Sequence, residues 1–417
     1  MKPSAMTRLE IKSGVNQNLY KNPDFVRSYG WNRTMMHLIG GWPEENDNFF
    51  MRNRLFFNSL AIMLLINLPQ TATLPVVWGD LNAVIDFFSV NLAVNLSLMK
   101  IIWLGIHRST ITNLLKLMAE DWLMETTHEE REEMVKMTKI IGVISSLSFY
   151  GTLSLFATYI PAQIVLQLQL KDDPNVDSRL SIGFLYNCVF PFDTSSLSVF
   201  LPIWICQFFM TYVSMAGYSS PDSFLVMLVF HQCGQLRVLR RRLERICDEK
   251  TLANSREFWI KIREIVNRQM HLNARVSAIE EKFHKVFLAV TLSCILTACT
   301  QAFVVITMLQ SSEDGFPVTK MIFLLILATY DLGHFFIYCL AGDVLMNESS
   351  KFGETAYNSR WYDLSTNEAK SVLIFTSRSR LPQQISAGKF TVLSLPLFTT
   401  IVQTAMSYLS VLLALKV

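Results

Sequence analysis

Seven apolar segments, each long enough to cross a lipid bilayer, constrain the fold of this chain more than any other feature. They lie at roughly 55–77, 82–106, 141–168, 195–230, 285–310, 318–342 and 390–415. A membrane-crossing helix needs about 20 mostly apolar residues. The composition agrees, because 17% of the residues are charged, against about 25% in soluble domains. The sequence therefore predicts an all-α polytopic membrane protein with seven transmembrane helices.

The distribution of Lys and Arg among the connecting segments predicts the orientation of these helices. The chain has 37 Lys and Arg residues, and 32 of them lie on one side of the predicted membrane: 8 in segment 1–54, 5 in 107–139, 13 in 235–286 and 6 in 343–389. The other side carries 4, and Lys100 lies inside span two. Cytoplasmic connections are enriched in Lys and Arg. We therefore expect a cytoplasmic N-terminus and, after seven crossings, an extracellular C-terminus. G-protein-coupled receptors have the opposite orientation, which disfavours that class.

The predicted topology divides the chain into six parts. Apolar residues recur at helical spacing between charges beyond the fourth span, which predicts that helices continue into the cytoplasm there. In chain order the parts are a cytoplasmic N-terminal segment (1–54), spans one to four (55–230), a cytoplasmic helical extension that could anchor the assembly (231–284), spans five and six (285–342), a cytoplasmic connector (343–389) and span seven (390–417).

The sequence offers no motif for catalysis, for a cofactor or for nucleic-acid binding. It contains no Gly-rich phosphate loop, no metal-spaced cluster of His and Cys, and no nucleophile motif. The basic run Arg240-Arg241-Arg242 lies at the inner mouth of a span, where it is typical of a cytoplasmic flank. We therefore expect a protein that is not an enzyme, holds no cofactor or metal, and has the lipid bilayer rather than nucleic acid as its surroundings.

Ionisable residues inside the predicted spans indicate functional or structural contacts, because charges are costly in a membrane. Asp331 and His334 lie three residues apart on one face of span six. An interhelical hydrogen bond is the simpler interpretation, and a proton relay, as in a transporter, is the alternative. Lys100 lies inside span two, and Asp86 near its outer end could reach the membrane surface.

Three stretches of the second half of the chain carry a family resemblance. Residues 227–246 contain His231-x-Cys233-Gly234-Gln235-Leu236, and residues 341–365 contain Gly-Asp, Ala-x-Tyr and Trp-Tyr elements. Residues 377–415 contain Arg, Pro, Gly-Lys-Phe and Ser-Tyr in order. Together they resemble the insect odorant receptor family, and in particular the odorant-tuned, hymenopteran-like subunits. The long cytoplasmic insertion of the shared olfactory co-receptor is absent.

The resemblance implies a function and partners. It implies a subunit of a ligand-gated, non-selective cation channel in the plasma membrane of sensory neurons. The channel would be a hetero-tetramer with the olfactory co-receptor, and its pore would be lined by span seven. A small hydrophobic odorant, volatile or similar to a cuticular lipid, would bind in the outer half of the helical bundle. Aromatic and small polar residues on the outer parts of spans two, three, four and six are the candidates: Phe87, Phe88, Asn91, Tyr150, Ser154, Tyr159, Phe200, Trp204 and Phe323.

Span seven has a polar stripe that could line a pore. Thr400, Gln403, Thr404, Ser407 and Ser410 recur at three- and four-residue intervals, and the same face continues to the apolar Val411 and Leu415. A polar stripe that ends in an apolar ring is typical of a gate that closes by dewetting. Small hydroxyls also hold helices together in membranes, which is the structural alternative. Ala414 departs from the co-receptor, which has an amide side chain there.

Two other function classes stay open. A gustatory-type seven-span channel shares the expected topology, but only Tyr408 matches its C-terminal element. A secondary transporter should show internal repeats and broken spans at matching places in two halves. The sequence contains no such repeat, so the odorant receptor interpretation is favoured.

Overall fold

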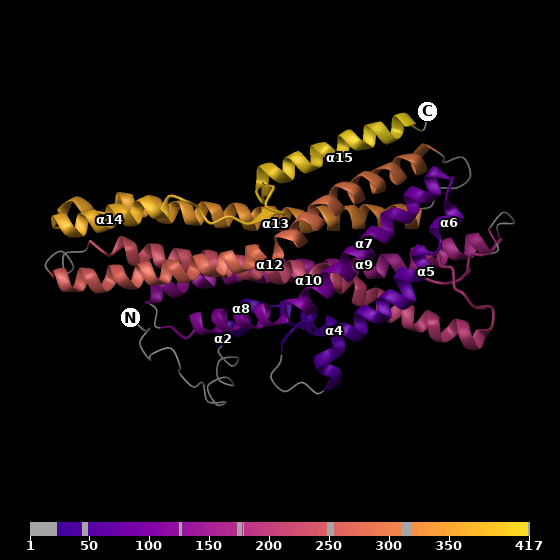
Figure 1. Cartoon of the computed structure of the whole chain (residues 1–417). Helices are drawn as coiled ribbons and strands as arrows, with labels where there is room; N and C mark the ends of the chain where they lie inside the picture. Colours follow the sequence, from indigo (N-terminus) through magenta and orange to yellow (C-terminus); the bar gives the residue numbers. More distant parts are fainter. Residues whose placement is uncertain are drawn as a thin grey trace.

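The computed structural model describes residues 23–43, 49–124, 127–172, 177, 179–247, 254–310 and 318–415. For residues 51, 52, 82, 172, 309, 310 and 412–415 it describes the backbone alone. The described chain is an elongated bundle of helices (Figure 1). In chain order the helices are α2 (Pro23–Tyr29), α3 (Asn32–Ile39), α4 (Phe49–Ile62), η1 (Met63–Asn67), α5 (Leu68–Thr71), α6 (Leu74–Val77), α7 (Leu81–Ile106), α8 (Arg108–Asp121), α9 (His128–Asp172), α10 (Leu197–Glu244), α12 (Ser255–Gln310), α13 (Val318–Asn358), η3 (Trp361–Asp363), α14 (Thr366–Ser379) and α15 (Leu395–Leu415).

Six of the described helical runs are long and apolar enough to cross a membrane. They are Asn53–Val77, Ala83–Ile106, His128–Lys171, Leu197–Glu244, Ser255–Met308 and Val318–Asp363, and α15 adds a shorter apolar run, Leu395–Val411. The 48 residues of α10 would measure about 72 Å at 1.5 Å per residue, more than twice the roughly 30 Å of a hydrocarbon core. The long helices therefore combine a membrane-length part with an extension beyond it.

Helix α10 lies at the centre of the bundle. It packs against α7, α9, α12 and α13, and every residue from 219 to 236 is buried. A helix that is buried on all sides needs apolar or internally paired residues around its whole circumference. This requirement explains why polar residues of this stretch, such as Asp222 and His231, have partners on neighbouring helices.

The run that corresponds to the predicted first span is not a single regular helix. A π-helical turn, η1, follows α4, and Pro69 sits at the start of α5. Proline has no backbone N–H, and its ring clashes with the carbonyl four residues earlier, so a regular α-helix is interrupted there. The chain then reaches α7 through the short α6.

The predicted start of span seven, at residue 390, is wrong by five residues. Residues 386–392 form a small antiparallel hairpin of β1 (Ser386–Ala387) and β2 (Thr391–Val392), and α15 begins at Leu395. Gly388 and Lys389 both have φ 64° in the turn, a left-handed conformation that favours glycine. A Cβ on Gly388 would also lie 2.7 Å from Leu288 Cδ2. The Gly-Lys-Phe element thus fixes the angle at which the chain enters α15.

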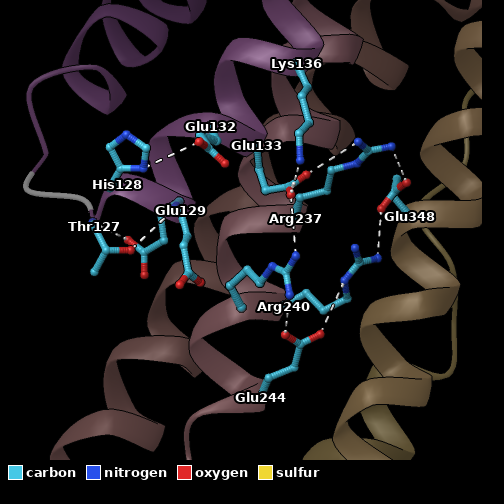
Figure 2. A network of polar contacts seen from close by, with 12 residues as sticks. Thr127, His128, Glu129, Glu132, Glu133, Lys136, Arg237, Arg240, Glu244 and Glu348 are labelled. Atoms are coloured by element: carbon cyan, nitrogen blue, oxygen red, sulfur yellow. Dashed lines mark hydrogen bonds and ion pairs between the residues drawn. The ribbon is translucent and has the colours of Figure 1, made fainter.

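One end of the bundle, formed by residues 231–247, 254–285 and 343–379 and called the basic end below, is held together by ion pairs. Glu348 of α13 accepts from Arg237 (2.7 Å) and Arg240 (3.1 Å) of α10 (Figure 2). Glu133 of α9 lies 3.6 Å from both Arg237 and Arg241. The arginine run that could resemble a nucleic-acid patch is therefore engaged with carboxylates from two neighbouring helices.

Asp121, at the end of α8, is a second centre of charge pairing at the basic end. Its buried carboxylate accepts hydrogen bonds from His231 of α10 (2.9 Å) and from Arg268 (2.6 Å) and Arg275 of α12. Burial favours the protonated acid, but the hydrogen bonds from His231 and Arg275 outweigh it and hold the pKa of Asp121 well below its usual range. One carboxylate thereby links three helices.

Aromatic residues of the predicted connector divide between buried and exposed positions. Trp361 is partly buried against the core, whereas Tyr357 and Tyr362 are exposed. Glu368 completes a capping box with Ser365 at the start of α14 and accepts a hydrogen bond from Ser255 of α12 at 2.6 Å. The connector is thus largely helical and is tied to the start of α12.

Candidate functional site

A partly open cavity lies between helices of the bundle, toward the end opposite the basic end. This inner chamber has a volume of about 50 Å³, which is room for several water molecules. Aromatic and aliphatic side chains of α7, α9, α10 and α13 form most of its wall, and Asp331 is its one acidic residue: Val90, Ala93, Val94, Leu155, Tyr159, Tyr186, Ser214, Met215, Tyr218, Phe323, Leu327, Tyr330 and Asp331 line it. A mainly apolar wall with a few polar groups suits a small organic ligand.

A second, more polar chamber lies beside the first, nearer the ends of the helices. This outer chamber has a volume of about 120 Å³, and its wall includes Phe87, Asp86 and Lys320. Asp86 and Lys320 form an ion pair at 2.9 Å that joins α7 to α13. Asp86, which was expected to reach toward the membrane surface, is therefore paired with another helix.

Tyr159 and Phe323 lie where the two chambers meet, together with Val90 and Tyr186. Both residues line both chambers, and their ring centroids lie 5.2 Å apart. Tyr159 is held in place because its hydroxyl donates to the carbonyl oxygen of Leu185 at 2.8 Å.

The structure brings together three of the nine predicted ligand-binding residues. Tyr159 and Phe323 line both chambers, and Phe87 lines the outer one. Phe88 packs edge-on against Phe87, with ring centroids 5.2 Å apart. Asn91 is buried, and its side-chain oxygen accepts from Asn95 at 2.7 Å. These two residues support α7 next to the cavity.

The remaining four predicted residues lie elsewhere. Tyr150 is 57% exposed and meets the ring of Trp31, which belongs to the segment just before α3. Ser154 lines a separate open groove between α9 and α13. Phe200 packs on Phe184 of the preceding loop, and Trp204 stacks on Phe208 of its own helix.

Tyr186 is a cavity residue that sequence reasoning missed. It belongs to the connection before α10. The start of this connection is polar, as in a loop, whereas its residues 183–190 are mainly apolar, as in a protein core. Phe184, Leu185, Tyr186 and Cys188 are all buried. The apolar run in this connection was the signal that it folds back over the bundle. Tyr218 and Tyr330 were also missed, because aromatic residues within a span cannot be assigned to a face toward lipid or cavity without the helix packing.

A cluster of charged and polar side chains lies beneath the inner chamber. Lys100 of α7 lies 2.7 Å from Asp222 of α10, and both side chains are buried. The other oxygen of Asp222 accepts from the Tyr338 hydroxyl at 2.7 Å, and His334 lies 3.3 Å from the carboxylate. Lys100 also donates to the carbonyl oxygen of Tyr218 at 2.9 Å. The sequence indicated Lys100 and His334, but Asp222 was not recognised as their common partner.

Asp331 makes an interhelical hydrogen bond, as the simpler interpretation of the sequence predicted. Its Oδ2 accepts from Gln301 of α12 at 3.0 Å. His334 is directed to Asp222 of a different helix rather than to Asp331. The two residues on one face of α13 therefore serve two separate contacts.

The polar stripe of α15 faces away from the rest of the chain. Ile401, Ala405 and Leu409 are buried on the side of α15 that contacts α12 and α13. At 100° per residue, the stripe with Gln403, Thr404, Ser407 and Val411 is centred about 140° from that face, and Val411 is 56% exposed. The hydroxyls of Thr404 and Ser407 donate to carbonyl oxygens of their own helix. The side chain of Leu415, the last predicted gate residue, lies outside the described residues.

Comparison with proteins of known sequence and structure gives consistent relationships. A family model described as 7tm Odorant receptor matches residues 80–406. Odorant receptor 13a of Drosophila melanogaster is 26% identical over 281 residues, which cover 62% of this chain and 64% of that receptor, slightly less than two thirds of the relative. Odorant receptor 9a of the same species is 22% identical over 334 residues, 78% of this chain and 80% of the relative. The odorant receptor coreceptor of Ooceraea biroi is 34% identical over 87 residues, 21% of this chain and 18% of the coreceptor.

The fold is that of a solved olfactory receptor. The structure of the insect olfactory receptor OR5 from Machilis hrabei matches with a TM-score of 0.73 over 94% of this chain and 99% of that one, at 14% identity. The same receptor in complex with eugenol matches with a TM-score of 0.70 over 94% of this chain and 100% of that one, also at 14% identity.

Long apolar helices around a cavity of aromatic and aliphatic side chains, together with the match to the odorant receptor family model, define a multi-span transmembrane receptor. The family model covers most of the chain. The chain belongs to the 7tm odorant receptor family, and it is not the co-receptor, which it matches over a short stretch alone.

Proposed function

We propose that this receptor is an odorant-tuned subunit of a ligand-gated, non-selective cation channel, and that its ligand binds in the inner chamber. The observation that carries the proposal is the cavity of aromatic and aliphatic side chains on the far side of the bundle from the basic end. Within the inner chamber, the binding proposal rests on Tyr159 and Phe323, predicted from the sequence, and on Tyr186, Tyr218 and Tyr330. Phe87, also predicted, lines the outer chamber. Binding of eugenol by the structurally similar receptor supports a small aromatic or aliphatic odorant as ligand.

The membrane arrangement that we propose has seven crossings, with the N-terminus in the cytoplasm. In it α15, with 21 residues, is the seventh crossing, since about 20 residues suffice for one. The asymmetry of 32 against 4 cations between the two sides supports a cytoplasmic basic end. The cavity then opens toward the outside, where odorant arrives.

We assign the lining of the pore to α15. Its polar stripe is not covered by the described part of its own chain, so equivalent helices of other subunits can meet along it. Gln403, Thr404 and Ser407 would line a wet conduit, and Val411 with Leu415 would form the apolar constriction. Water leaves a narrow apolar ring, and a cation cannot cross without its hydration. The closed channel would be sealed in this way.

The partner that we propose is the olfactory co-receptor, in a hetero-tetramer in the plasma membrane of sensory neurons. The stretch of likeness to co-receptors supports a common mode of assembly. Odorant would open the pore only by binding more tightly to the open arrangement of the bundle, because a ligand shifts an equilibrium through its difference in affinity. The chambers would therefore have to change shape when α15 moves.

Current recording from cells that express this chain with and without the co-receptor tests the proposal. A panel of odorants should evoke inward cation current in the co-expressing cells, and surface staining of both subunits reports assembly. Surface-expressed complexes that respond to no odorant in a broad panel would contradict the proposed function.

A further inference from the structure

Tyr186 is the one described residue in the wall of the inner chamber that lies outside the helices, and it also lines the outer chamber. It belongs to residues 183–188, called the Tyr186 segment below, which connect α9 to α10. The segment forms no helix, and its regular backbone pairing is one isolated bridge between Ser181 and Cys188. Buried backbone groups outside helices and sheets need other partners. The position of the Tyr186 ring therefore depends on the side chains that hold this segment.

Leu185, the residue just before Tyr186, has both of its peptide groups bonded to side chains of membrane-length helices. Its N–H donates to Gln207 Oε1 of α10 at 3.3 Å, and its carbonyl oxygen accepts from the Tyr159 hydroxyl of α9 at 2.8 Å. Leu185 is 1% exposed and Gln207 0%. The Gln207 amide also donates to the carbonyl oxygen of Leu65 in η1 at 2.9 Å. One buried amide thus fixes the Tyr186 segment to α10 and to the interrupted first span.

A second glutamine holds both ends of the segment. Gln167 of α9 accepts at its Oε1 from the Gly183 N–H at 2.8 Å, and its Nε2 donates to Asn187 Oδ1 at 2.9 Å. Gly183 has φ 95°, a conformation that favours glycine. Neither Gln167 nor Gln207 lines a chamber, so an effect of either on a ligand has to pass through the residues that it holds.

We propose that Gln207 and Gln167 are positioning residues for odorant selectivity, because they hold the Tyr186 segment and with it the aromatic ring in the wall of both chambers. The inference rests on the proposed function, since it needs an odorant in the inner chamber. Loss of either amide leaves a backbone N–H of the segment without its acceptor, which is unfavourable in a protein interior. The segment then adopts another arrangement, and the displaced ring of Tyr186 changes the shape of the space that an odorant can occupy.

Replacement of Gln207 by methionine, which has a similar length and no amide, tests the inference. Gln207→Met is expressed with the co-receptor, and half-maximal concentrations are measured for the straight-chain alcohols from butanol to decanol. The measured quantity is the ratio of these concentrations between the longest and the shortest active alcohol. The ratio should change at least about fivefold, since one methylene group in an apolar pocket is discriminated about tenfold or more. An unchanged ratio in surface-expressed complexes overturns the inference.

Gln232→Met is the matched control for a general loss of stability. Gln232 is another buried glutamine of α10, and its Nε2 donates to the carbonyl oxygen of Leu272 at 2.9 Å. It lies at the basic end and lines neither chamber. Its replacement should lower the surface level as Gln207→Met does and should leave the ratio unchanged. A similar change of the ratio in both variants would assign the effect to loosened packing and would overturn the inference.

A double variant shows whether Gln207 acts through Tyr186. Tyr186→Leu removes the ring and should change the ratio by itself. Gln207→Met added to Tyr186→Leu should change the ratio little further, because residues that act as a unit are not additive. Additive changes would mean that Gln207 acts on the ligand by another route, and the inference would fail.

Failure of this inference is distinguishable from failure of the proposed function. Absence of current with every odorant of a broad panel, despite surface complexes with the co-receptor, contradicts the channel function and the inference with it. Robust current with an unchanged ratio contradicts the positioning role alone. If Gln207→Met does not reach the surface, Gln167→Met replaces it, because it breaks the contacts with Gly183 and Asn187. An unchanged ratio in that variant overturns the inference equally.

Discussion

Lys100 Nζ of α7 lies 2.7 Å from Asp222 Oδ2 of α10, with side-chain exposures of 0% and 3%. The pair connects two helices next to the inner chamber, and Tyr338 and His334 of α13 approach the same carboxylate. A buried charge without its partner is far less favourable than the pair. The relative placement of α7, α10 and α13 is therefore tied to one ionic contact.

Removal of one charge of this pair should destabilise the fold. Lys100→Met leaves Asp222 buried without its cation, at a cost of about 3–5 kcal/mol, so surface expression should fall sharply. The double variant Lys100→Met with Asp222→Asn removes both charges and keeps an acceptor for the Tyr338 hydroxyl. It should recover much of the expression and of the melting temperature of the purified protein. A double variant no better than the single one would mean that the pair does not act as a unit.

Enlargement of the residue between the two chambers should change odorant size preference. Phe323→Trp adds volume at the point where the chambers meet, so that the larger indole ring takes up space that an odorant could occupy. The sensitivity to larger odorants should therefore fall about tenfold or more relative to the sensitivity to small ones. Dose–response curves for a homologous series of alcohols measure the change. Tyr150→Leu, at an exposed aromatic residue of α9 outside the cavity, is the matched control and should leave the size preference unaltered.

Hydration of the proposed constriction should weaken its closed state. Val411→Ser places a hydroxyl on the exposed stripe of α15, and odorant-independent current should rise because an apolar ring seals by excluding water. Met406 is also exposed and lies about 140° around the helix from Val411 at 100° per residue. Met406→Ser should therefore raise the current less. Equal effects of the two substitutions would show that α15 is oriented differently in the assembled channel.

The asymmetry of charge predicts which side of the membrane each end of the chain occupies. An epitope inserted after Ser4 should be stained only after permeabilisation, and one added after Val417 should be stained on intact cells. Asn32 and Asn347 lie in glycosylation sequons on the side expected to be cytoplasmic, so both should remain unmodified in a mobility-shift measurement. Surface staining at the N-terminal epitope would reverse the orientation.

Protonation of Asp121 should lower the stability of the basic end, and it should do so only at acid pH. Its folded-state pKa is depressed, so its stabilising contribution is fully present above the unfolded value of about 3.9 and is lost as the pH falls through the folded value. Above about pH 5 the contribution of Asp121 to the melting temperature of the purified receptor should be complete and should not vary with pH. Asp121→Asn should lower the melting temperature at neutral pH and flatten its decline below about pH 4. A variant that melts with the wild-type profile would show that the three-helix contact contributes nothing measurable.

Much of the fold could be predicted because a helix that crosses a membrane needs a long apolar run, which is visible in the sequence. Runs of apolar residues predicted α7, α9, α10, α12 and α13, and helical spacing of apolar residues predicted the extensions of α10 and α12. The start of α15 was predicted too early, because hydropathy does not distinguish the extended residues 391–394 from the apolar helix that follows. The hairpin turn at Gly388 and Lys389 depends on backbone conformation, which an average of hydropathy cannot register.

The cavity could be predicted in part. Aromatic residues on the outer halves of the spans were predicted to form a ligand pocket. Tyr159 and Phe323 line both chambers and Phe87 lines the outer one, whereas ligand binding by them stays a prediction. Tyr150 has the same character in the sequence, yet it meets Trp31 outside the bundle. The rotation of α9 about its axis separates these outcomes, and that rotation depends on packing against α10 and α13.

The sequence by itself determined the class of molecule, the lengths of its helices, the asymmetry of charge between its ends and the polar stripe of α15. Each of these follows from local composition, because a bilayer-sized apolar run and a residue's spacing along one helix need no knowledge of other helices. Only the tertiary structure decided that Asp222 is the partner of Lys100, that Leu185 accepts a hydrogen bond from Tyr159, and that Asp331 accepts one from Gln301. These contacts join residues more than twenty positions apart in the chain, and the distances that create them are set by the packing of whole helices.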